Sequence, residues 1–167
     1  MAIELLAERF DERLVSAPAD ALVATARVDG QRVALCVPQT YMNESGRSVA
    51  PLMKRCGIAD DPERLVVIHD ELDLEPGRVK LKRGGGLAGH NGLRSIAAHC
   101  HTQEFLRVRI GVGKPPGGAS KGANHVLARP PGAVRDEFHQ SIVTAADSIE
   151  AILSAGMDAA MGDFNRS

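Results

Sequence analysis

The sequence predicts a single α/β domain in which helices flank a twisted, mixed β-sheet. Segments with strand periodicity interleave with segments of helical periodicity along the chain, and no internal repeat or linker separates them. The length of 167 residues suits one hydrophobic core. We expect the domain to span residues 1–155 and residues 156–167 to form a C-terminal tail.

The N-terminal part is expected to contain a helix followed by a β-hairpin. Residues 2–14 place apolar side chains on one helical face. Segments 21–28 and 31–37 have the composition of strands and flank Asp29-Gly30, a dipeptide that favours a tight turn. Pro38 is expected to end the second strand.

A second helix is expected from about Ser45 to just before Gly57, with a kink at Pro51. Its inward side chains are predicted to be Val49, Leu52, Met53 and Cys56. The continuously apolar run at 65–68 is typical of a buried parallel strand, and it ends in His69-Asp70-Glu71.

The remaining elements follow the same alternation. In segment 78–82, Val79 and Leu81 are expected to face the core. A glycine-rich loop then leads into a helix with Asn91 as its N-cap. Segment 105–113 alternates again, with Arg107 and Arg109 on the face opposite its apolar residues. We expect a flexible loop at 114–122, an extended piece at 125–130 and a helix over about 133–153.

Composition excludes several classes of protein. No apolar run is long enough to span a bilayer, and three cysteines without a CxxC motif argue against a disulfide or zinc framework. The net charge is −1, but the segment from Arg78 to Lys121 holds nine basic residues and one acidic residue. This asymmetry fits a localised site for a polyanion, although charge alone slightly favours a solvated basic face.

Four polar residues near predicted strand and helix ends could carry chemistry. Asp70 could orient a histidine or a water, or could cap a loop; His69 should point to the opposite face of its strand. Asn43 and Asn91 could bind substrate, or could hold a turn and a helix end. The loop GGGLAGHNG matches neither a dinucleotide-binding nor a P-loop pattern, so nucleotide triphosphate binding is not expected.

Taken together, four segments resemble the bacterial peptidyl-tRNA hydrolase family in order and spacing. They are Tyr41–Gly46 (YMNESG), His69–Leu74 (HDELDL), Gly84–Leu93 (GGGLAGHNGL) and Arg107–Gly113 (RVRIGVG). The resemblance covers about residues 3–153. It implies a peptidyl-tRNA hydrolase-like α/β fold and an esterase that cuts the bond between a peptide and the 3′ end of tRNA.

The resemblance also implies roles for individual residues. An aspartate at the position of Asp70 orients a general-base histidine, Asn43 and Asn91 bind substrate near the ester with Tyr41 beside them, and Lys82 and Arg109 contact tRNA phosphates. No metal or other cofactor is implied, because an ester with a good leaving group needs only a tuned base and placed amide donors. We expect a cytoplasmic monomer whose partner is tRNA.

Two departures from the family pattern stand out. Leu87 occupies a position where many members have histidine. Members also open with a strand, a Gly-x-Gly-Asn-Pro-Gly loop and an Arg-His-Asn segment, whereas here Met1 stands at the helix that follows them. We therefore expect the first strand and the catalytic histidine to be missing, and the chain as written to be inactive. A fragment or misassigned start, an inactive tRNA- or RNA-binding homologue and a decayed remnant all fit this expectation.

Overall fold

The computed structural model describes residues 1–87, 89–114 and 132–166. Within these ranges the chain divides into two compact units, one built mainly from residues 3–67 and 83–106 and the other from residues 68–82 and those after 106. The predicted extended piece at 125–130, most of the predicted loop at 114–122 and Lys121 lie outside the described residues. The predicted α/β class is confirmed.

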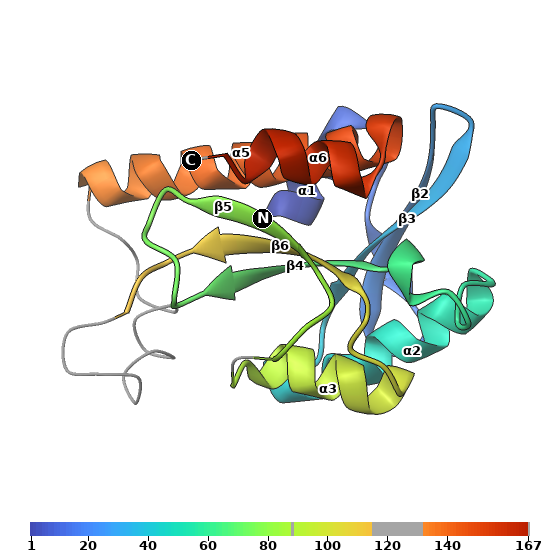
Figure 1. The fold of residues 1–167 in the computed structure, drawn as a ribbon. Coiled ribbons are helices and arrows are strands. Elements are labelled where there is room, and N and C mark those ends of the chain that lie inside the picture. Colours follow the sequence, from blue (N-terminus) through green and yellow to red (C-terminus); the bar gives the residue numbers. More distant parts are fainter. Residues whose placement is uncertain (88, 115–131, 167) are drawn as a thin grey trace. The chain divides into compact units, whose positions relative to one another are not determined.

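The first unit begins with helix α1 (Ala2–Arg9) and an antiparallel sheet, β1-β2-β3 (Val15–Ala17, Ala21–Val28 and Gln31–Pro38; Figure 1). The predicted hairpin is confirmed: Val28 pairs with Gln31, and Asp29 and Gly30 both have positive φ, at 50° and 79°. Two successive left-handed residues are what a type I′ turn requires. Helix α1 ends before the predicted residue 14, because Asp11 turns left-handed with φ 55°.

The first unit continues with the 3₁₀ helix η1 (Met42–Glu44), helix α2 (Gly46–Arg55), the 3₁₀ helix η2 (Pro62–Arg64) and helix α3 (Asn91–Cys100). An apolar cluster formed by Val49, Met53, Leu93, Ile96 and Phe105 packs α2 against α3. Cys56 was expected to face inward but is exposed, because α2 ends one residue earlier and Cys56 is its C-cap.

The second sheet contains β4 (Val66–Glu71), β6 (Leu106–Gly111) and β5 (Val79–Arg83), in that order. The amide of Leu106 donates to the carbonyl of Leu65 and the amide of Val112 to that of Glu71, so β4 and β6 run parallel. Strands β5 and β6 run antiparallel. The predicted mixed pairing therefore occurs here, while the first three strands, joined by short turns, pair among themselves in a sheet of their own.

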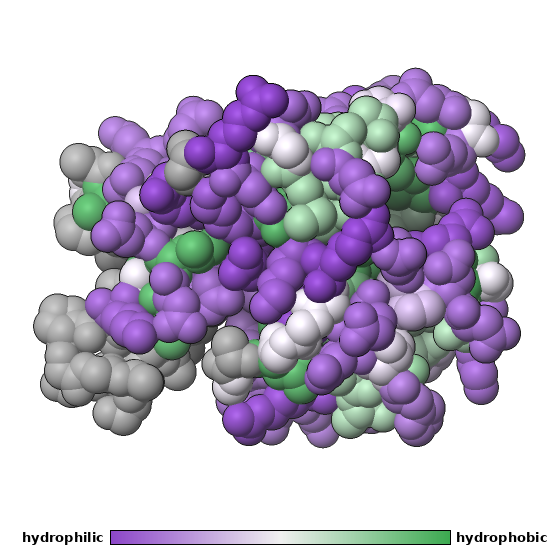
Figure 2. All heavy atoms as spheres, in the orientation of Figure 1, coloured by the Kyte–Doolittle hydropathy of each residue, from purple (hydrophilic) through white to green (hydrophobic). Residues whose placement is uncertain are grey.

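Two helices complete the second unit. Helix α5 (Gly132–Ala155) agrees with the helix predicted over 133–153, and it buries Ile142, Ala145, Ala146 and Ile149 at helical spacing. Residues 156–167, expected to be a tail, contain helix α6 (Met157–Phe164), which packs against α5. No helix in the described ranges is long and apolar enough to cross a membrane. Hydrophilic residues predominate on the face shown in Figure 2.

Candidate functional site

The two candidate amide residues lie on neighbouring elements of the first unit. Asn43 is in η1 and Asn91 is the first residue of α3, and both side chains are exposed. The two elements pack together, and a Cβ built on Gly92 would lie 3.2 Å from Cγ of Met42. The same Cβ would lie 2.9 Å from Cε1 of His90, so a larger residue at this position would require the side chains of His90 and Met42 to shift. The structure brings the elements that carry Asn43 and Asn91 side by side.

The N-cap of α3 is His90, which corrects the prediction that Asn91 caps this helix. His90 has an extended backbone, and its Nδ1 accepts a hydrogen bond of 3.2 Å from the amide of Leu93. An imidazole can fill this role only when Nδ1 carries no proton. Asparagine is a preferred N-cap and histidine is not, so sequence preferences pointed one residue too far along the chain.

A second close contact holds the start of α2 against α3. The amide of Gly46 donates a buried hydrogen bond of 2.9 Å to Oγ of Ser95. A Cβ on Gly46 would lie 2.2 Å from the carbonyl oxygen of Ser95 and 2.6 Å from Nδ1 of His99. Because α2 begins two residues after η1 ends, this contact also fixes where Asn43 lies relative to α3.

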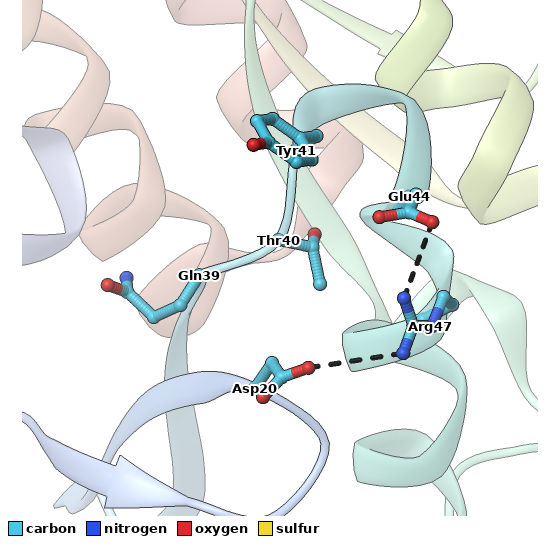
Figure 3. A pocket seen from close by; sticks show the side chains of 6 residues that line it. All are labelled: Asp20, Gln39, Thr40, Tyr41, Glu44 and Arg47. Carbon is cyan, nitrogen blue, oxygen red and sulfur yellow. Dashed lines mark ion pairs between the residues drawn. The ribbon is translucent and has the colours of Figure 1, made fainter.

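Tyr41 lies beside an open pocket in the first unit. Its side chain is 82% exposed, and the pocket is lined by Asp20, Gln39, Thr40, Tyr41, Glu44 and Arg47 (Figure 3). The Arg47 guanidinium lies 3.3 Å from the Glu44 carboxylate and 4.0 Å from that of Asp20. Sequence reasoning missed Asp20 and Arg47, because their pairing joins a turn after β1 to helix α2 and leaves no local pattern.

Asp70 lies near the end of β4 in the second unit and is half-buried. His69 is only 8% exposed, and its Nδ1–H donates a hydrogen bond of 2.8 Å to the backbone carbonyl of Asp70. His69 thus bonds to the backbone of Asp70, and its side chain belongs to the interior of this unit. This agrees with the expectation that neighbouring strand residues do not share one site.

Lys82 and Arg109 lie on adjacent strands of the second sheet. The amide of Gly111 donates to the carbonyl of Arg78 at 2.8 Å, which sets the antiparallel register of β5 and β6. In this register Lys82 lies opposite Arg107, and Lys80 lies opposite Arg109. All four side chains therefore project from one face of the sheet, while Val79, Leu81, Val108 and Ile110 are buried on the other.

The four cations differ in exposure. Lys80, Lys82 and Arg109 are half-buried, but Arg107 is only 2% exposed. The alternation of β6 correctly placed Arg107 and Arg109 on one face, but it could not show that this face is covered at Arg107. Like charges directly opposite each other on paired strands repel.

Two of the three cysteines, Cys36 and Cys100, are poor candidates for a nucleophile. Burial, with a smaller contribution from Cys56, raises the pKa of the Cys36 thiol to about 11, and burial also raises the pKa of Cys100. Both thiols therefore stay protonated near neutral pH, and only a thiolate attacks readily. In the part of the chain that the structure describes, no three His, Cys, Asp or Glu side chains are arranged to hold a metal ion.

Comparison with known proteins supports one family throughout. The family model for peptidyl-tRNA hydrolase matches residues 1–167. The peptidyl-tRNA hydrolase of Cutibacterium acnes is 50% identical over 138 residues, which are 83% of this chain and 68% of that protein. That of Mycolicibacterium vanbaalenii is 45% identical over 161 residues, or 96% of this chain and 82% of that protein.

The solved structures agree with the sequences. The crystal structure of peptidyl-tRNA hydrolase from Acinetobacter baumannii superposes with a TM-score of 0.90 at 36% identity, covering 99% of this chain and 83% of that one. The identity is high enough for the likeness to reflect common descent as well as a common fold. The chain belongs to the peptidyl-tRNA hydrolase family.

Proposed function

We propose that the protein hydrolyses the ester between a peptide, or an N-blocked amino acid, and the 3′ end of tRNA, and so returns tRNA from stalled translation. The observation that carries this proposal is the family match over residues 1–167. The exposed amides of Asn43 and Asn91, on elements that pack together, can bind the substrate near its ester. Asp70 is proposed to orient a general-base histidine, the role that the family resemblance implies for an aspartate at this position.

Hydrolysis of an N-blocked aminoacyl-tRNA tests this function directly. The protein expressed from its complete gene should release the blocked amino acid from labelled tRNA at a rate far above background. Binding of tRNA without release would contradict the proposal and would identify an inactive tRNA-binding homologue.

We further propose that the protein acts as a monomer in the cytoplasm, where its substrate is made.

The cations of the second sheet are proposed to bind tRNA phosphates. Changing Lys82 or Arg109 to alanine should weaken the binding of all tRNAs alike. It should also reduce the slope of log affinity against log salt by about one unit, because one fewer counterion is released. Filter binding between about 50 and 200 mM salt would measure both effects.

Lys54 offers a matched control for this experiment, because it is an exposed lysine in the last turn of α2. Lys54→Ala should leave the affinity and the slope close to those of the parent protein. If Lys82→Ala and Arg109→Ala behaved like Lys54→Ala, the basic face of β5 and β6 would be an ordinary solvated surface.

A further inference from the structure

The edge strand β5 is completed by a side chain from the end of the chain. Asn165 follows α6 as its C-cap, and its backbone N–H donates a hydrogen bond to the carbonyl of Met161. Its side-chain Oδ1 accepts a hydrogen bond of 2.8 Å from the amide of Leu81, and its Nδ2 donates one of 2.9 Å to the carbonyl of Leu81. The side-chain amide thus takes the place of a peptide group in a neighbouring strand.

A third bond joins the same two elements. Nζ of Lys80 donates a hydrogen bond of 2.7 Å to the backbone carbonyl of Asn165. The negative end of a helix dipole lies at its C-terminus, so α6 favours a cation there. Lys80, which lies on the same face of β5 as Lys82, is therefore directed to α6. Figure 1 shows the C-terminal end of the chain near β5.

These three bonds act on the two residues that precede Lys82. Within the described part of the chain, β5 pairs with β6 on one side only, and the backbone groups on its other edge face no strand of this sheet. Without Asn165, the edge groups of Leu81 would exchange with water, and β5 would open locally more often. Each opening would move Lys82 away from Arg107, which lies opposite it on β6, and so away from the face that it shares with Arg109.

We infer that Asn165 is a positioning residue for tRNA binding, which holds β5 so that Lys82 and Arg109 bind phosphates together. Asn165 touches no substrate in this scheme. The inference rests on the proposed function, because it assumes that Lys82 and Arg109 contact tRNA. It assigns helix α6 a part in substrate binding through the strand that it holds.

Two substrates separate positioning from a general loss of structure. One is a whole N-blocked aminoacyl-tRNA, and the other is the same ester on the 3′-terminal trinucleotide, which lacks the phosphates of the tRNA body. In the protein from the complete gene, Asn165→Ala should raise KM for the whole tRNA by roughly three- to tenfold, the equivalent of one lost phosphate contact. Turnover of the trinucleotide ester should stay within about twofold of the parent.

Two further variants sharpen the result. If Asn165 acts through Lys82, the double variant Asn165→Ala/Lys82→Ala should bind tRNA about as well as Lys82→Ala alone, since coupled residues are not additive. Ser154→Ala is a neutral control, because its hydroxyl is exposed and bonds only weakly, at 3.3 Å, to the carbonyl of Ala151. It should match the parent on both substrates.

Each outcome decides the inference. Equal losses of activity on both substrates would show that Asn165 has only a structural role. Full additivity of the effects of Asn165→Ala and Lys82→Ala on tRNA binding would show that Asn165 does not act through Lys82. Either result overturns the inference. No change in Asn165→Ala also overturns it. If the parent hydrolyses neither substrate, the proposed function is wrong, but the inference about Asn165 can still be tested. Measuring tRNA binding by Asn165→Ala, Lys82→Ala, the double variant and Ser154→Ala then decides whether Asn165 acts through Lys82. A parent that does not bind tRNA at all overturns the inference as well.

Discussion

Gly46→Ala is expected to lower the free energy of unfolding by roughly 2–5 kcal/mol, a large part of the stability of an ordinary domain. The new Cβ would lie 2.2 Å from the carbonyl oxygen of Ser95, which belongs to the backbone and cannot move aside cheaply. Helix α2 would have to retreat from α3, and the buried bond from the Gly46 amide to Ser95 Oγ would be lost. Urea unfolding followed by circular dichroism measures the change.

Gly162→Ala provides the matched control for this prediction. Gly162 lies within α6, and a Cβ placed there would meet nothing within 4 Å. Alanine is the better helix former, so this variant should be unchanged or more stable by roughly 0.5–1 kcal/mol. If Gly46→Ala were as stable as the parent, α2 would not approach α3 as closely as described above. A stable Gly46→Ala variant with weakened substrate binding would instead show that η1 had moved with α2.

Asp70→Asn is expected to slow hydrolysis of an N-blocked aminoacyl-tRNA by roughly a hundredfold or more in the protein from the complete gene. A carboxylate beside a general-base histidine stabilises the imidazolium that forms when the base takes a proton from water. A neutral amide of the same shape cannot supply that charge. The effect should fall on kcat, because the loss occurs in the transition state, and single-turnover release of the blocked amino acid measures it.

Asp73→Asn tests whether this loss is specific to Asp70. Asp73 lies three residues further along and forms an exposed ion pair of 3.2 Å with Lys114. Exposed pairs contribute little, so this variant should keep its activity within about twofold of the parent. If both variants lost activity equally, general loss of negative charge would explain the result. Undiminished kcat in Asp70→Asn would remove Asp70 from the proposed mechanism.

Local sequence patterns predicted the elements that depend on local chemistry. The Asp29-Gly30 turn was predictable because few dipeptides adopt two left-handed conformations in succession. The alternation of β5 correctly placed Val79 and Leu81 in the interior because one face of the sheet is buried. The boundaries of α5 followed from helical spacing. Each of these features involves residues that are close together in the chain.

Contacts between distant residues were not predictable in this way. Gly46 and Ser95 are 49 positions apart, and Leu81 and Asn165 are 84 apart, so no window of periodicity contains either pair. The cap at His90 was missed because its neighbour Asn91 has the more usual side chain for that role. Their place near strand and helix ends already made Asp70, Asn43 and Asn91 candidates, but spacing left their roles open. Those roles, and the choice of Lys82 and Arg109, came from resemblance to the family.

The register of β5 and β6 has a consequence for how this family could be re-engineered. The chain leaves the second sheet after Arg83 and re-enters it at Leu106, which lies opposite Arg83 in this register. The stretch between them carries His90, Asn91 and helix α3. Residues 78–111 therefore form a segment whose first and last residues are hydrogen-bonded to each other. An exchange of this block between relatives would have to keep Gly46 and Asn165 matched to it, because Ser95 and Leu81 inside the block bond to them. A chimaera made in this way would transfer the cationic strands and the amide-bearing helix together, whereas a breakpoint at Gly84 would divide two antiparallel strands that must match.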